Sequence, residues 1–263
     1  LLYSASPAMQ DDDVTKITGM GQFEILNPTV YQAKWEAVAK EINKILGMEG
    51  FGTYVPVTAS SIADVQTESS DYAFRRYFNN NLLEGLHFPP FYYGSARATP
   101  SHNLVKAFYA KNGYPATDVR SGVDLSDPDF DLTQLYAVLD NRFALNVYYH
   151  SATFGDSGQP LDMSEGGKDS PSFSENATRT GYYLAKFMNT VADFLKPLEE
   201  QDSRHYNPML RKAEVWLNFA EASNEAFGPK VVGPGCTRSA YDVIKTIREK
   251  SGGITDVTYL DEM

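Results

Sequence analysis

One short segment carries a residue pattern used in nucleophilic catalysis. Gly155-Asp156-Ser157-Gly158 matches the segment around the reactive serine of chymotrypsin-like proteases, and His150 lies close to it in sequence. That chemistry needs a β-barrel, an upstream histidine and a buried aspartate that orients it. The flanking sequence has helical patterns instead, so we interpret the segment as a Gly/Asp/Ser turn.

Candidate phosphate and metal sites are also incomplete. Gly166-Gly167-Lys168 is followed by Asp169, where a phosphate loop needs Ser or Thr for magnesium. A cluster of aspartates offers oxygen ligands for calcium but lacks the central Gly and final Glu of an EF-hand loop, which favours a solvated acidic loop; its members are Asp124, Asp127, Asp129 and Asp131. The histidines are scattered and Cys236 is the only cysteine, so no zinc site is predicted. We predict no catalytic residue, no metal and no cofactor.

Composition disfavours several kinds of partner. The 263 residues include 34 acidic and 23 basic side chains, a net charge of -11, which repels nucleic acid and anionic lipid. No apolar run reaches the roughly 20 residues of a membrane-spanning helix, so we predict no direct membrane insertion of this segment. The chain starts at Leu1 without Met and stops at Met263 just after a helical pattern, and we expect both ends to be cuts.

Periodicity predicts a helical scaffold that carries long loops. Helices are expected from Asn27-Pro28 to Gly47, from Thr99-Pro100 towards Gly113, and as a pair at 208–227 and 239–250. Strands are expected at 143–149 and 181–187, and polar loops at 52–71, 112–134 and 151–180. The first helix of the pair is apolar on more than one face and should be covered on two sides. In the pair we expect mutual or neighbouring packing of Leu210, Ala213, Leu217, Ala220, Val243, Ile244 and Ile247.

Aromatic residues make up 13% of the chain, and many tyrosines lie outside the predicted helices. A sugar ring needs flat aromatic faces together with polar donors and acceptors. The segment His87-Phe88-Pro89-Pro90-Phe91-Tyr92-Tyr93 offers aromatic faces on a loop stiffened by proline. We predict a ligand site at His87, Phe91, Tyr92 and Tyr93, with Tyr54 and Arg75 as neighbours. The alternative is that these aromatic rings pack the loops onto the scaffold.

Four ordered segments together resemble the SusD/RagB family of outer-membrane nutrient-binding proteins. Thr99-Pro100-Ser101-His102-Asn103-Leu104-Val105-Lys106-Ala107-Phe108 resembles its Pro-Ser/Thr-x-x-Leu-Val-x-Ala-Phe element. Asp140-Asn141-Arg142-Phe143 is similar to its Asp-Pro-Arg-Phe strand, and Thr180-Gly181-Tyr182-Tyr183-Leu184-Ala185-Lys186-Phe187 to its Thr-Gly-Tyr-Tyr-x-x-Lys-Phe element. Arg211-Lys212-Ala213-Glu214-Val215-Trp216-Leu217-Asn218-Phe219-Ala220-Glu221-Ala222 resembles its Arg-x-Ala-Glu-Val-x-Leu-x-x-Ala-Glu-Ala helix.

The resemblance implies a mainly α fold in which TPR-like helix pairs, an α-solenoid, pack against an irregular loop-rich region with a few short strands. It implies one SusD-like region over 1–263, truncated at both ends, with a TPR-like helix at 27–50, a loop-rich ligand-binding region at 51–200 and a TPR-like helix pair at 201–252. The expected role is delivery of a polysaccharide or oligosaccharide to a TonB-dependent, SusC-like transporter. The expected location is the outer membrane, as a surface-exposed lipoprotein whose anchor lies outside this sequence.

Two other classes remain open. A glycoside hydrolase needs two well-placed carboxylates in an aromatic cleft, and the chain has both residue types. A TPR-like scaffold would bind another protein and no glycan. Glycan binding without release of reducing ends would support a glycan-binding protein over both the hydrolase and the protein-interaction scaffold.

Overall fold

The computed structural model describes residues 31–56, 71–79, 82–127, 129–186, 188, 197 and 204–263. They fall into two units. The first contains residues 31–56 and 211–250. The second contains the described residues between 71 and 210, together with 251–263. The start of the predicted first helix, at Asn27-Pro28, and much of the predicted loop at 52–71 lie outside the described residues.

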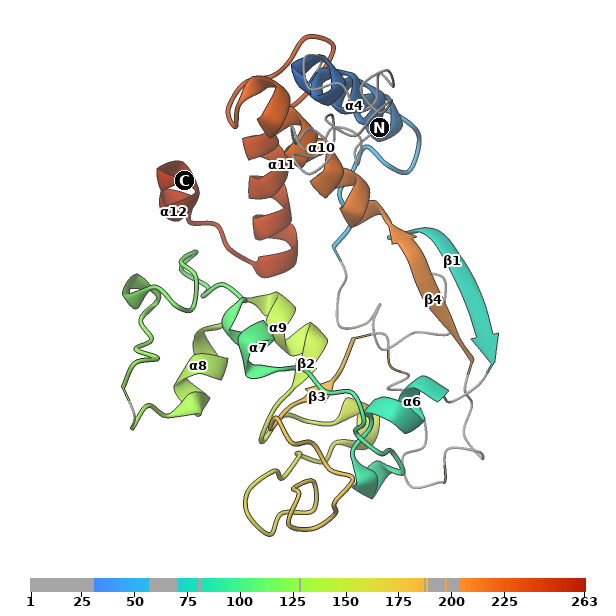
Figure 1. Ribbon diagram of the computed structural model, residues 1–263, viewed down its shortest axis with the longest axis vertical. Helices are drawn as coiled ribbons and strands as arrows, with labels where there is room; N and C mark the ends of the chain where they lie inside the picture. Colours follow the sequence, from blue (N-terminus) through green and yellow to red (C-terminus); the bar gives the residue numbers. More distant parts are fainter. Residues whose placement is uncertain are drawn as a thin grey trace, which may run out of the picture. The chain divides into compact units, whose positions relative to one another are not determined.

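The first unit is built on helices α4 (Tyr31–Leu46), α10 (Lys212–Phe227) and α11 (Ala240–Ile247). Helix α10 packs against both α4 and α11 (Figure 1), so the prediction that it is covered on two sides is confirmed. Trp35 and Ala39 of α4 share one cluster with Ala222 and Ala226 of α10. These alanines have little side chain to hold the helices apart, which lets α4 approach α10 closely.

The predicted helix pair differs from the structure at its first end. Residues Arg204–Arg211 form strand β4, and the helix starts at Lys212 instead of near 208. Leu217 is 47% exposed, so its predicted packing is wrong, and Leu210 lies in the strand. The other five predicted packing residues share one cluster: Ala213, Ala220, Val243, Ile244 and Ile247.

Local signals set the second helix of the pair. Ser239 and Asp242 form a capping box, in which the Asp242 amide donates to Ser239 Oγ and the Ser239 amide donates to Asp242 Oδ2, at 3.2 and 2.9 Å. After Ile247 the chain continues as a π-helical turn, Arg248–Gly252. The sequence prediction of one element over 239–250 therefore matches the position of this helix.

The second unit combines short helices with two small sheets. Strand β1 (Tyr72–Asn79) pairs with β4, and β2 (Val147–Tyr148) pairs antiparallel with β3 (Tyr183–Leu184), with Val147 opposite Leu184 and Tyr148 opposite Tyr183. Figure 1 shows β1 and β4 side by side. The helices are α6 (Leu82–His87), α7 (His102–Lys106), α8 (Leu132–Val138), α9 (Asn141–Asn146) and α12 (Thr258–Glu262). Single 3-10 turns occur at Pro90–Tyr92, Val119–Ser121 and Gly155–Ser157.

Two side-chain bonds explain where α7 and α9 begin. Ser101 Oγ accepts the Leu104 amide at 3.2 Å, and α7 ends at Lys106, earlier than the predicted stop at Gly113. Residues 143–146, predicted as strand, are helical because Asp140 caps α9 and accepts the Arg142 amide at 2.8 Å. Only the end of that predicted strand is extended, as β2.

The described residues are rich in helix and have few strands, which agrees with the coarser part of the sequence prediction. The TPR-like solenoid arrangement and the three-part division of one family region remain predictions. Among these residues no helix is both long and apolar enough to cross a membrane.

Candidate functional site

The aromatic loop, His87–Tyr93 at the end of α6, exposes some of its aromatic rings and buries others. Phe88 and Tyr92 are 0% and 1% exposed, whereas Phe91 and Tyr93 are 45% and 47% exposed. Tyr93 ends the 3-10 turn in the left-handed region, with φ of 65°. The prediction that Tyr92 offers an accessible face is therefore wrong, and for this ring the packing alternative holds. Ligand binding by Phe91 and Tyr93 remains a prediction.

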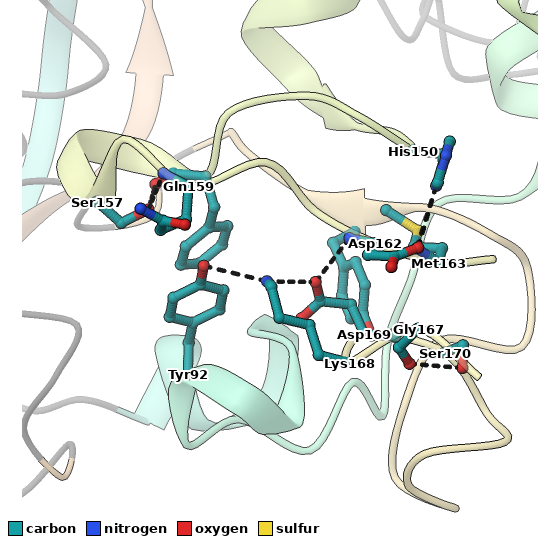
Figure 2. A network of polar contacts seen from close by, with 12 residues as sticks. Tyr92, His150, Ser157, Gln159, Asp162, Met163, Gly167, Lys168, Asp169 and Ser170 are labelled. Atoms are coloured by element: carbon teal, nitrogen blue, oxygen red, sulfur yellow. Dashed lines mark hydrogen bonds and ion pairs between the residues drawn. The ribbon is translucent and has the colours of Figure 1, made fainter. Parts of the chain in front are cut away.

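Tyr92 is buried because both of its ends have partners. Its ring stacks on Phe154, with centroids 4.3 Å apart and an angle of 21°. Its hydroxyl accepts a hydrogen bond from Lys168 Nζ at 3.3 Å (Figure 2). The same ammonium group lies 4.7 Å from the centroid of Phe91, a cation–π distance. Lys168 thus connects the buried and the exposed ring of this loop.

A buried carboxylate fixes Lys168 in turn. Asp169 is 0% exposed, and its Oδ2 accepts from Lys168 Nζ at 2.7 Å and from the Asp162 amide at 2.8 Å (Figure 2). The Tyr183 hydroxyl donates to the Asp169 carbonyl at 2.8 Å, and burial raises the pKa of Tyr183 to about 12. Charge-assisted bonds inside a protein are strong, so this network holds the aromatic loop against the core of the unit.

A pocket of about 300 Å³ opens beyond the aromatic loop. It lies between two segments that are far apart in sequence, one after the aromatic loop and one before β3. The lining side chains are mostly polar and include both charges: Ser95, Ala96, Arg97, Thr99, Glu175, Asn176, Ala177 and Arg179. Hydroxyl, amide, carboxylate and guanidinium groups therefore converge on one hollow, as they do in sites for polar small molecules.

The first wall of the pocket, residues 95–99, is hydrogen-bonded to α6. The amide and hydroxyl of Ser95 both donate to the Gly85 carbonyl, at 2.9 and 2.7 Å, and the Arg97 amide donates to the Leu86 carbonyl at 2.8 Å. A Cβ at Gly94 would lie 2.1 Å from the Phe88 carbonyl oxygen, so no side chain fits there. Ala96 has φ of 41°, a strained conformation for this residue.

The second wall of the pocket, residues 175–179, contains a buried threonine. Thr178 is 1% exposed; its amide donates to the Tyr183 hydroxyl at 3.1 Å, and its Oγ1 accepts from the amides of Thr180 and Tyr182 at 3.1 and 3.3 Å. Thr180 Oγ1 donates to Thr99 Oγ1 across the two segments at 3.1 Å. Both walls thus have fixed backbones.

The remaining predicted site residues lie in other settings. His87 donates from Nδ1 to the Ala98 carbonyl at 2.7 Å, and Arg75 lies on β1. Tyr54 is 7% exposed and belongs to the first unit, where its ring meets the edge of Trp216 at 5.4 Å. Sequence reasoning missed the pocket itself. The available signal was an arginine beside each of two aromatic motifs: Arg97 follows the segment His87–Tyr93, and Arg179 precedes Tyr182-Tyr183.

The protease-like segment has no catalytic arrangement. Ser157 Oγ donates to the Phe154 carbonyl of its own turn at 2.5 Å. His150 accepts the Met163 amide at Nδ1, at 3.2 Å, and Figure 2 shows it at the other end of the network from Ser157. The segment acts as the turn that was predicted.

The aspartate cluster is engaged in local turns. Asp124 accepts from the amide and hydroxyl of Ser126, which lower its pKa, and Asp131 caps α8 through Thr133 in the same way. Within the described residues, no three His, Cys, Asp or Glu side chains come together as metal ligands.

A hydrogen-bonded group packs near α7. His102 Nδ1 lies 2.9 Å from the Tyr182 hydroxyl, which accepts from the Tyr136 hydroxyl at 3.2 Å. Partial burial, and after it the charge of Lys106, lower the pKa of His102. The neutral imidazole is therefore the favoured form in the folded protein.

The SusD family model matches residues 59–259, more than half of the chain. The chain belongs to the SusD family. A search of curated proteins found no match. The fold is similar to that of a SusD-like carbohydrate-binding protein from Bacteroides fragilis, with 20% identity, a TM-score of 0.58, and coverage of 86% of this chain and 43% of that one. A second SusD-like protein from Bacteroides fragilis has 21% identity, a TM-score of 0.63, and coverage of 88% and 46%. The chain spans less than half of the length of either SusD-like protein.

Proposed function

We propose that this chain binds a polysaccharide or oligosaccharide and belongs to a system that delivers it to a TonB-dependent, SusC-like transporter. The observation that carries the proposal is the polar pocket between residues 95–99 and 175–179. Membership of the SusD family, and a structural relative described as carbohydrate-binding, support it.

The pocket has the chemistry that a sugar needs. Sugar hydroxyls both donate and accept hydrogen bonds, and Asn176 can do both while Thr99 offers a hydroxyl. Ala96 adds a small apolar surface for the C–H groups of a ring. The loop that exposes Phe91 and Tyr93 runs directly into the first wall, which makes these rings candidates for stacking on further sugar units.

Binding is proposed without hydrolysis. Glycosidases of the usual kind need two carboxylates on either side of the scissile bond. Among the described side chains that line the pocket, Glu175 is the one carboxylate. Asp169 is fully buried and bound to Lys168, which makes it unsuited to reach a substrate.

The location and partner follow from the family. We propose an outer-membrane lipoprotein at the cell surface, with the transporter as its protein partner. The net charge of -11 disfavours nucleic acid and anionic lipid as alternatives.

A glycan panel tests the proposal. The full chain is titrated by calorimetry with neutral and acidic polysaccharides, and released reducing ends are measured in the same mixtures. Loss of a hydrogen-bonding amide typically costs about 0.5–1.5 kcal/mol, so Asn176→Ala should weaken binding by that amount at unchanged thermal stability. The control is Asn224→Ala, an exposed asparagine on α10 outside the pocket. Failure to bind any glycan on the panel would reject the proposal, and turnover would replace it by the hydrolase.

A further inference from the structure

Two arginines that line the pocket have no side-chain partner among the residues that the structure describes. Arg97 and Arg179, one on each wall, form no ion pair, side-chain hydrogen bond or ring contact with any residue in the described part of the chain. Arg120, by contrast, binds both Asp118 and Glu262, each at 2.8 Å. A guanidinium group can donate two parallel hydrogen bonds to an oxyanion. Two guanidinium groups at one pocket, without a partner among the described residues, therefore favour an anionic group on the ligand.

The charge balance at the pocket is opposite to that of the chain. Acidic side chains outnumber basic ones by 34 to 23 overall. Around the pocket, two arginines stand against Glu175, and Glu175 forms no ion pair with either arginine in the described structure. A protein with this excess of acid has many carboxylates with which to neutralise two exposed arginines. Within the described residues, two arginines without a side-chain partner are therefore a specific feature of the pocket.

The walls hold the two arginines on fixed backbones. The Arg97 amide is bound to the Leu86 carbonyl, and Arg179 lies between Thr178 and Thr180, which share a hydrogen bond at 3.1 Å. A ligand then has to order only the arginine side chains, which lowers the entropic cost of binding.

We infer that the pocket binds an acidic sugar unit, with the carboxylate of a hexuronate or a sulfate ester held between Arg97 and Arg179. The inference rests on the proposed function and narrows its ligand class. Asn176 and Thr99 are available for the hydroxyls of the same unit. Glu175 opposes the anion by like charge and therefore limits its affinity.

Matched pairs of glycans test the charge preference. Each acidic polysaccharide on the panel, whether uronate or sulfated, is compared with its own carboxyl-reduced or desulfated form, so linkage and chain length stay constant. The full chain should bind the acidic form about thirtyfold more tightly, because two charge-assisted contacts of about tenfold each are opposed by about threefold from the charge of Glu175. Uronate and sulfate pairs measured separately show which oxyanion is preferred.

Two substitutions in the pocket should weaken binding of the acidic glycan, and a third should strengthen it. Arg97→Gln and Arg179→Gln should each weaken binding of the acidic form by about tenfold and leave the neutral form within about twofold. Glu175→Gln should strengthen binding of the acidic form by about threefold. Lys245→Gln is the control, because it removes one exposed positive charge from α11, outside the pocket. Melting temperatures of all four variants should stay at the value of the parent chain.

The two proposals fail in different ways. Equal affinity for acidic and neutral forms, or arginine variants that bind the acidic form as well as the Lys245 control does, would overturn the acidic-sugar inference and leave glycan binding intact. Absence of binding to every form would overturn both.

Discussion

Changing Tyr92 to alanine should unfold the aromatic loop and leave no intact site to measure. The ring is 1% exposed, stacks on Phe154 and accepts a hydrogen bond from Lys168. Replacing a buried large aromatic side chain by alanine costs about 3–5 kcal/mol in unfolding free energy. At about 2–4 °C per kcal/mol for a chain of this size, the melting temperature should fall by roughly 6–20 °C.

Two further variants show how much of the stability loss in Tyr92→Ala comes from ring packing, as distinct from the hydrogen bond to Lys168 and from the loss of an exposed ring. Tyr92→Phe keeps the stack on Phe154 and loses the hydrogen bond from Lys168, at a cost of about 0.5–1 kcal/mol. Tyr93→Ala changes a ring that is 47% exposed and should stay within about 1 kcal/mol of the parent chain. Thermal unfolding followed by circular dichroism gives all three values, and calorimetry with the best glycan gives the affinities. The reasoning is refuted if Tyr92→Ala keeps the parent melting temperature and loses glycan affinity.

The remaining predictions concern the stability of the second unit, which contains the pocket. Asp140→Ala removes the buried carboxylate that caps α9 and pairs with the partly exposed Arg142, and urea unfolding should show a loss of about 2–5 kcal/mol, against a smaller loss for Asp140→Asn, which keeps a cap acceptor. Gly94→Ala forces a Cβ onto the Phe88 backbone and should cost at least about 2 kcal/mol. Gly122→Ala meets no atom within 4 Å and strains only a φ of 85°, for about 1 kcal/mol; equal losses at the two glycines would contradict the close contact. The depressed pKa of His102 means that the unfolded chain binds more protons, so stability should fall as pH drops below about 6.5. A His102→Gln variant should lose less melting temperature than the parent between neutral and acidic pH, and an equal loss would show that His102 is not responsible.

Local sequence signals predicted the helices that carry their own end markers. The capping box of Ser239 and Asp242 and the apolar spacing of α11 are formed within a few residues, so periodicity placed that helix well. The prediction was less accurate at residues 143–146, where alternating apolar residues suggested a strand. There the Asp140 cap and its pair with Arg142 impose a helix. An alternating pattern fits a short helix as well when one side chain satisfies its first amides.

The aromatic loop shows the limit of composition as evidence for a site. The sequence indicated that His87–Tyr93 is rich in rings, but it could not show which of them face solvent. Burial depends on Phe154 and Lys168, which lie more than 60 positions further along the chain. Phe91 and Tyr93 are exposed, and residue type does not distinguish either of them from the buried Tyr92.

The sequence by itself determined the family resemblance, the helical character, the incompleteness of the catalytic motifs and a net negative charge that disfavours nucleic acid and anionic lipid. These properties depend on local pattern, residue order and composition, which need no knowledge of contacts. The tertiary structure decided the site. Arg97 and Arg179 are 82 positions apart, and they line one pocket because separate hydrogen bonds to α6 and around Thr178 fix the two walls. Convergence of distant side chains depends on the packing of the whole unit, and no spacing within a segment encodes it.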